Sequence, residues 1–215
     1  TINKANSTIT ATGTTTFTYS GSPQGPTTSS VSGSTGAVTY SYSGTGSTSY
    51  GPSSTRPTNA GTYQVIATVP ADANFNEATS APLTFTINKA NSTITTTGTT
   101  TFTYTGAAQG PSSSDVTGSA GTVNYSYSGS GYGPSTTPPT NAGSYQVIAI
   151  LPADANFNGA TSDLLAFTIN KAVLTITADD QTVAFGTAES TVTGSGTYTA
   201  TGFVNNEDSS VIDGS

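Results

Sequence analysis

Apolar and polar residues alternate in short segments along this chain. In residues 15–20, Phe17 and Tyr19 fall on one face of an extended strand, and the threonines between them fall on the other. The same period of two recurs at residues 37–43, 62–69 and 83–88. Segments rich in Gly and Pro separate these stretches, and no segment shows a helical period. The pattern therefore predicts short, half-buried β-strands joined by turns.

A decamer, Thr-Ile-Asn-Lys-Ala-Asn-Ser-Thr-Ile-Thr, occupies residues 1–10 and returns unchanged at residues 86–95. Its first half returns again at residues 168–172. The step between copies is roughly 80 residues, which is larger than a solenoid repeat and large enough for each unit to fold around its own core. The decamer is therefore interpreted as the joint between copies of one module.

We predict an all-β fold of tandem immunoglobulin-like antiparallel β-sandwiches, because about seven short strands at this spacing are typical of that architecture. A β-grasp is the alternative, and it requires a helix packed across the sheet. Residues 1–4 are interpreted as the end of a preceding repeat, and residues 5–88 and 89–170 as two complete immunoglobulin-like repeats. Residues 171–215 do not align with them, and we expect an incomplete third β module of a different subtype.

One local motif supports the sandwich. Residues 59–63 read Asn-Ala-Gly-Thr-Tyr, and residues 141–145 read Asn-Ala-Gly-Ser-Tyr. Both resemble the Asp-x-Gly-x-Tyr corner of immunoglobulin-like domains, in which the tyrosine hydroxyl bonds back to the nearby backbone. Tyr63 and Tyr145 are therefore predicted to have this structural role.

The composition excludes several classes of function. The formal net charge is −7, and Lys plus Arg total 4, whereas nucleic acids and anionic membrane surfaces require clustered basic residues. No run of about 18 apolar residues is present, so no direct insertion into a membrane is predicted. The chain has no His and no Cys, which removes the familiar Ser–His and Cys–His nucleophiles. We therefore expect no enzymatic activity and no catalytic residues.

One recurring motif carries side-chain oxygens at alternate positions, as the start of a calcium-binding loop does. Its residues are Asp72, Asn74 and Asn76 in the first repeat and Asp154, Asn156 and Asn158 in the second. The glutamate that closes such a loop is missing in both copies. In the alternative interpretation, these residues cap turns while the Phe inside each motif fills the core. Ca²⁺ is the one cofactor that the sequence leaves open.

Several motifs together carry a family resemblance. They are Phe-Thr-Tyr-Ser-Gly-Ser-Pro-Gln-Gly-Pro (residues 17–26), Asn-Ala-Gly-Thr-Tyr (59–63) and Ala-Asp-Ala-Asn-Phe-Asn (71–76). They resemble the immunoglobulin-like and MBG-type repeats of giant bacterial surface adhesins, with the gliding-motility adhesins of the Bacteroidota among the most similar. Gly-Phe-Val-Asn-Asn-Glu-Asp (202–208) is similar to a second MBG subtype. The resemblance implies export and a structural or adhesive role, and it carries no catalytic residue.

These observations favour a stalk segment of an exported, cell-surface protein, which holds a binding region away from the cell. Lys89, Ala90 and Asn91 link the repeats without a Gly or Pro that would bend the chain, so neighbouring repeats of the same chain are its first partners. Few Lys and abundant Thr and Ser favour an extracellular position. The alternatives are a module that binds surface glycans or other cells by avidity, and a subunit of an extracellular filament.

Overall fold

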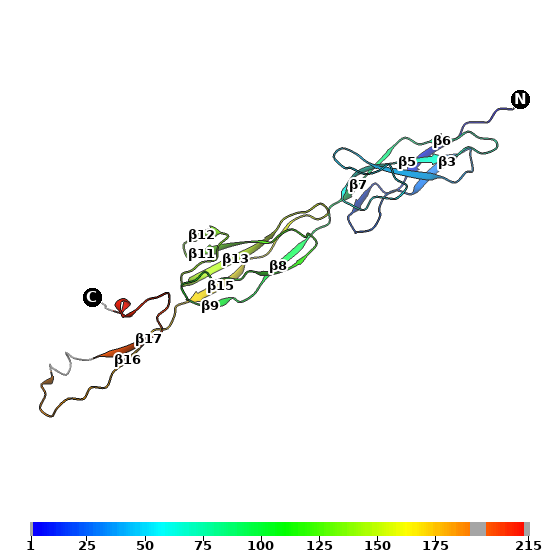
Figure 1. Ribbon diagram of the computed structural model, residues 1–215. Coiled ribbons are helices and arrows are strands. Elements are labelled where there is room, and N and C mark those ends of the chain that lie inside the picture. The colour runs from blue at the N-terminus through cyan, green and yellow to red at the C-terminus, as the bar shows by residue number, and fades with distance from the viewer. Residues whose placement is uncertain (1, 190–196, 213–215) are drawn as a thin grey trace. The chain divides into compact units, whose positions relative to one another are not determined.

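The computed structural model describes residues 2–189 and 197–212 (Figure 1). Contacts group the chain into two compact units. The first comprises Thr1–Thr93, Val116–Thr122 and Leu151–Ala160, and the second comprises Ile94–Asp115, Val123–Ile150 and Thr161–Ser215. Within the described residues, no helix has both the length and the apolar character needed to cross a membrane.

The first repeat is built from two sheets. In the smaller sheet, β1 (Thr8–Thr12) pairs with β3 (Thr28–Ser32) in antiparallel fashion. The larger sheet has the order β2-β7-β5-β4, and β6 pairs with β5 beside this path. Its strands are β2 (Thr16–Thr18), β4 (Thr39–Gly44), β5 (Gly61–Val69), β6 (Ala78–Thr79) and β7 (Leu83–Asn88).

The second repeat has the same arrangement. β8 (Thr93–Thr97) and β10 (Ser113–Thr117) form its smaller sheet, and the larger sheet has the order β12-β11-β13-β15-β9 with β14 on β13. The strands of the larger sheet are β9 (Thr101–Thr103), β11 (Asn124–Gly129), β12 (Tyr132–Ser135), β13 (Gly143–Leu151), β14 (Ala160–Thr161) and β15 (Leu165–Asn170). The predicted all-β fold of tandem sandwiches is confirmed. Residues 5–170 contain no helix, so the β-grasp alternative is wrong.

One strand pair in each repeat runs parallel, which differs from the purely antiparallel sandwich predicted above. β2 lies parallel to β7, with Phe17 opposite Ile87, and β9 lies parallel to β15, with Phe102 opposite Ile169. Alternation of apolar and polar residues shows that a segment is a strand but not the direction of its neighbour. The parallel pair joins the beginning of each repeat to its end.

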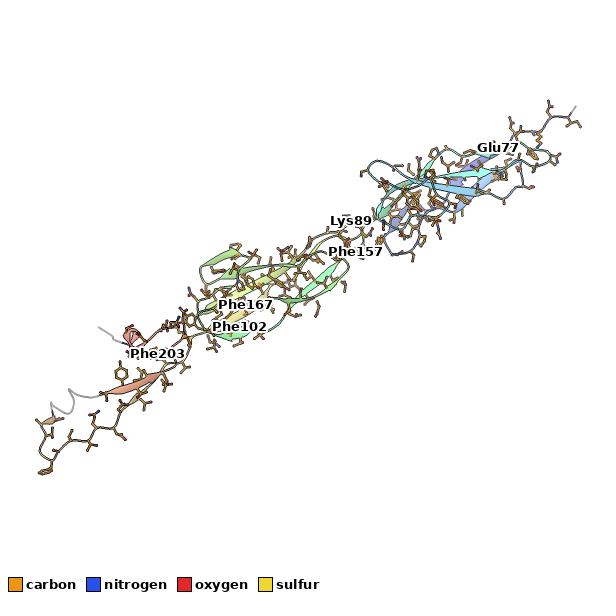
Figure 2. The ribbon with its side chains drawn as sticks, in the orientation of Figure 1. Glu77, Lys89, Phe102, Phe157, Phe167 and Phe203 are labelled. Atoms are coloured by element: carbon orange, nitrogen blue, oxygen red, sulfur yellow. The ribbon has the colours of Figure 1, made fainter. Side chains whose placement is uncertain are left out.

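The core of each repeat follows the alternation of its longest strand. Val65, Ala67 and Val69 of β5 are fully buried on one face, as a strand with a period of two requires. Aromatic rings pack around this row in edge-to-face pairs. In the second repeat, Phe102 and Phe167 form such a pair, with ring centroids 6.1 Å apart (Figure 2). Each sandwich therefore has its own apolar core.

The C-terminal segment differs from the two repeats. β16 (Thr175–Ala178) pairs with β17 (Tyr198–Thr201) in antiparallel fashion, and a 3-10 turn occupies Ser209–Val211. Ile176 and Phe185 are exposed, so this ribbon encloses no core within the part of the chain that the structure describes. Residues 190–196 and 213–215 of the predicted third module lie outside the described residues, as does Thr1 of the predicted preceding repeat. The predicted module boundaries stay predictions.

A substitution at Ile87 can test whether the two repeats have separate cores, because the Ile87 side chain is only 1% exposed. We expect Ile87→Ala to lower the free energy of unfolding of the first repeat by about 2–5 kcal/mol, since the substitution leaves a cavity in the core. Hydrogen–deuterium exchange with mass spectrometry in urea would follow each repeat separately. Ile2→Ala, at a fully exposed position, is the matched control. Equal loss of protection in both repeats would contradict the separation of the cores.

Candidate functional site: the two ends of each repeat

The chain is hydrogen-bonded as soon as it enters the first repeat. The Ala5 backbone N–H donates to the Asn74 carbonyl at 2.9 Å, and the Asn76 N–H donates to the Ala5 carbonyl at 2.8 Å. The Ser7 hydroxyl donates to the Asn76 carbonyl at 2.7 Å. We call residues 5–7 together with residues 72–76 the N-terminal clasp of the first repeat.

Residues 90–92 and 154–158 form the same clasp in the second repeat. The Ala90 N–H donates to the Asn156 carbonyl at 2.9 Å, and the Asn158 N–H donates to the Ala90 carbonyl at 2.8 Å. The Ser92 hydroxyl donates to the Asn158 carbonyl at 2.6 Å. The two clasps use the same backbone groups at equivalent positions, so this contact is a feature of the repeat rather than of one copy.

Side-chain amides strengthen both clasps. The Asn76 amide nitrogen donates to Asn6 Oδ1 at 2.9 Å, and the Asn158 amide nitrogen donates to Asn91 Oδ1 at the same distance. Asn91 is thus bound within the second repeat. Sequence reasoning treated the decamer and the Asp-Ala-Asn-Phe-Asn motif separately and missed that they bind each other. The available signal was that both motifs recur together, once per repeat.

Gly33, which directly follows β3, allows the chain there to pass close to the incoming residues of the clasp. Its φ is +107°, and a Cβ atom there would lie 2.9 Å from the Ser7 Cα and 3.0 Å from the Phe75 ring. Both the positive φ and the contact exclude a larger residue. Gly118 has the same role in the second repeat, with a φ of +96° and a Cβ position 2.9 Å from the Ser92 Cα.

Asp72 holds the clasp loop in shape through backbone N–H groups. Its carboxylate accepts from the N–H of Thr35 at 3.0 Å and from those of Asn74 and Phe75 at 2.9 Å each. These bonds, led by that from Thr35, lower the pKa of Asp72 from 3.8 to about 2. Asp154 is held in the same way, and the bond from the Ala120 N–H is the largest cause of its lowered pKa.

This geometry favours the capping interpretation over calcium. Both carboxylate oxygens of Asp72 already accept hydrogen bonds from N–H groups. The Asn76 amide nitrogen donates to Asn6 Oδ1. The described residues hold no group of three or more His, Cys, Asp or Glu suited to a metal ion. Phe75 does not fill the core as the capping interpretation expected. It is half-buried, and its backbone pairs with that of Ala5. A calcium role for these loops stays an untested prediction.

The chain is also hydrogen-bonded until it leaves each repeat. The Asn88 carbonyl accepts from the Tyr19 N–H at 2.8 Å, and the Asn170 carbonyl accepts from the Tyr104 N–H at 2.8 Å. Since Ala90 already belongs to the second clasp, only Lys89 separates the two hydrogen-bonded segments. The Lys89 ammonium itself donates to the Asp154 carbonyl at 2.5 Å. The link is therefore shorter than the three residues predicted from sequence.

The two predicted tyrosine corners lie beside these exits. The Tyr63 hydroxyl donates to the Asn59 carbonyl at 2.8 Å, and the Tyr145 hydroxyl donates to the Asn141 carbonyl at 2.9 Å. The Tyr63 ring stacks on Phe85, with centroids 5.4 Å apart. Burial raises the pKa of Tyr63 above its ordinary value of 10.0, so the hydroxyl remains a donor well into the alkaline range. The corner thus fixes the turn that leads into β5.

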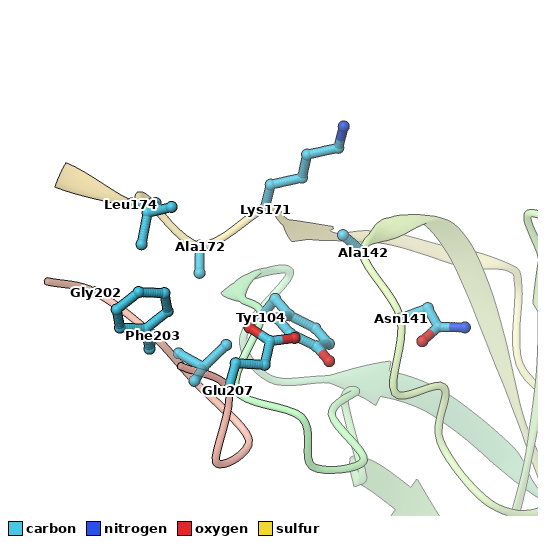
Figure 3. A pocket seen from close by; sticks show the side chains of 10 residues that line it. Tyr104, Asn141, Ala142, Lys171, Ala172, Leu174, Gly202, Phe203 and Glu207 are labelled. Atoms are coloured by element: carbon cyan, nitrogen blue, oxygen red, sulfur yellow. The ribbon is translucent and has the colours of Figure 1, made fainter. Parts of the chain in front are cut away.

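A pocket of ≈ 360 Å³ lies where the chain leaves the second repeat (Figure 3). Tyr104 and Asn141 line it together with Phe203 and Glu207 of the C-terminal segment. In Figure 3, the Lys171 side chain extends away from Glu207. The lining thus contains one carboxylate, that of Glu207, and one ammonium group, that of Lys171.

The stability of the first repeat at low pH tests the role of Asp72, because the pKa of Asp72 is lower in the folded than in the unfolded chain. Between those two pKa values the unfolded chain binds more protons, so the contribution of Asp72 to stability is complete above about pH 4 and is lost as the pH falls towards 2. We expect Asp72→Asn to destabilise the first repeat at neutral pH, with a difference from wild type that shrinks over this window. Urea unfolding followed by hydrogen exchange would measure it.

Asp154→Asn is the matched variant and should affect the second repeat alone. A difference between wild type and Asp72→Asn that stays constant down to pH 2 would contradict the assigned role.

Comparison with known protein families is consistent with this architecture. The family model described as MBG domain matches residues 7–91 and 92–173, which together make up more than half of the chain. No curated protein and no solved structure matches the chain. MBG repeats are non-catalytic structural modules, and their presence in tandem indicates a repeat module of an extracellular protein. With two adjacent copies that share one pattern of strands and clasps, the chain belongs to the MBG domain family.

Proposed function

We propose that this chain is a stalk segment of an exported bacterial surface adhesin, which spaces a binding region from the cell and transmits tension. The observation that carries the proposal is the continuity of backbone hydrogen bonding. Asn88 is bound in the first repeat and Ala90 in the second, so a single backbone residue, Lys89, lies between the two hydrogen-bonded segments. A link of one residue gives two folded repeats little freedom to move apart or tumble independently.

The strand order supports the transmission of tension. The chain enters the first repeat at Ala5, beside Phe75, and this loop follows the Val69 end of β5. The chain leaves at Asn88, near the Gly61 end of the same strand. The entering and leaving points therefore lie at opposite ends of the sheet.

The parallel pair of β2 and β7 lies between these two points. Pulling the ends of the repeat apart draws β2 and β7 in opposite directions along their length, because the strands run parallel. Their hydrogen bonds, including those from Thr86 N–H to Thr15 and from Tyr19 N–H to Asn88, then bear the load together. β9 and β15 repeat this arrangement in the second repeat. A pair loaded in this way resists force better than one whose bonds break in succession.

The position at a cell surface is supported by the composition and by the family. Tandem MBG domains indicate an extracellular repeat protein, and the chain is rich in Thr and Ser with few basic residues. A role in adhesion or gliding motility rests on the resemblance described above. The neighbouring repeats are the direct partners in this proposal.

Small-angle X-ray scattering tests the short link. We expect the scattering to indicate restricted bending at the link, because both sides of Lys89 are hydrogen-bonded. Insertion of a Gly-Ser-Gly-Ser segment after Lys89 should broaden the distribution of interatomic distances, since it adds a flexible connection. Scattering that the insertion leaves unchanged would show that the wild-type link is already flexible.

Single-molecule pulling tests the parallel strands. The chain has no Cys, so introduced cysteines give unique handles. Ile2→Cys with Lys89→Cys loads β2 and β7 in shear, whereas Ala37→Cys with Ala71→Cys pulls β4 and β5 apart from their open end, one pair at a time. We expect a several-fold higher unfolding force for the first handles. Equal forces for the two pairs would overturn the proposed load path.

A further inference from the structure

The first repeat carries a groove on its side that the stalk role does not use. The groove has a volume of ≈ 490 Å³ and lies over β4, and its lining residues belong neither to the clasp nor to β7. Six of its lining residues define its character: Pro23, Thr27, Val38, Tyr40, Ser54 and Arg56. Apolar surface with a few polar groups is the usual composition of a site for a small ligand.

Arg56 gives this groove a charge that is unusual in this chain. Of the four basic residues, three are the joint lysines, and Arg56 is the remaining one. No Asp or Glu occurs before Asp72 in the sequence. Within the part of the chain that the structure describes, no ion pair neutralises the guanidinium, which is exposed. The net negative charge of the protein comes largely from residues 171–215, outside this repeat.

Tyr40 supplies a fixed aromatic surface in the same groove. Its hydroxyl and the Ser29 hydroxyl are 3.1 Å apart and share a hydrogen bond, which holds the ring in place. Val38 and Pro23 continue the apolar surface, and Thr27 and Ser54 bring hydroxyl groups to its edge. A pyranose ring presents the complementary features, since it has an apolar C–H face and a rim of hydroxyl groups.

We propose that this groove binds a uronic-acid residue of an acidic polysaccharide. The C–H face of the sugar packs on Tyr40, and its carboxylate accepts two N–H groups from Arg56, a geometry that guanidinium and carboxylate favour. The hydroxyls of Thr27 and Ser54 bond to the hydroxyls of the sugar. This binding does not depend on the stalk role, because it requires neither the clasp nor the exit strands.

The second repeat provides a natural comparison within the same chain. It keeps Val123 and Tyr125 at the positions of Val38 and Tyr40, and the Tyr125 hydroxyl pairs with Ser114 at 3.1 Å as Tyr40 does with Ser29. Pro138 stands in place of Arg56, and Ala108 in place of Pro23. The second repeat therefore has the aromatic surface without the cation, and we assign the acidic-sugar site to the first repeat alone.

The test is an NMR titration of the full chain with trigalacturonate, a linear trimer of uronic acid. Saturable shifts are expected in β4 and around Ser54, and not in β11. The fully methyl-esterified trimer has the same sugar rings without the charge. Its affinity should be at least roughly tenfold lower, because it lacks the charged hydrogen bonds. Absence of saturable shifts with the acid, or equal affinity for the ester, would overturn the proposal.

Two variants locate the site. Arg56→Gln removes an exposed charge without burying anything, so the repeat should fold, and its affinity for trigalacturonate should fall roughly tenfold. Pro138→Arg combined with Ala108→Pro should create shifts in β11 that wild type lacks. Unchanged binding by Arg56→Gln would overturn the assignment, as would equally tight binding of a glutamate trimer, which would indicate an acidic peptide as the ligand.

Discussion

The structure depends on backbone hydrogen bonds that hold the chain at both ends of every repeat. Ala5 and Ala90 are paired as the chain enters, and Asn88 and Asn170 are paired as it leaves. Backbone groups cannot be altered by substituting side chains, apart from proline, so this mode of holding the chain tolerates a variable surface. It also explains why the molecule needs no reactive side chain for its proposed role. In that proposed role, a repeat that holds its first and last residues passes a pull from one neighbour to the next through its own sheet.

The sequence predicts the strands and the core well, because both follow from a period of two. Val65, Ala67 and Val69 were recognisable as an inward row, and the structure buries them completely. The parallel pairing of β2 with β7 was not recognisable, because an alternating pattern contains no information about the direction of a neighbour. β2 is also only three residues long, so its own pattern is short.

The clasp illustrates a second limit of sequence reasoning. The Ser7 hydroxyl and its acceptor, the Asn76 carbonyl, are separated by 69 positions in the sequence, and no propensity or turn rule connects segments so distant. The motif around Tyr63 was easier to predict from the sequence, because the Tyr63 hydroxyl bonds to a carbonyl only four residues away. Asp72 lies between these cases. Its side chain was expected to cap a turn, but its bond to Thr35 across the fold required the structure.

The two repeats are the same where the chain is held and different on their sides. Residues 5–7 recur unchanged as residues 90–92, whereas Arg56 becomes Pro138 and the loop after β4 shortens. The reason is physical. A clasp residue meets a partner from a distant segment, so a change on one side requires a matching change on the other. An exposed position on the groove meets solvent, so it can gain or lose a charge at little cost to stability. A tandem array of this kind can therefore keep one scaffold of strands and clasps while the sides of its individual repeats vary in charge.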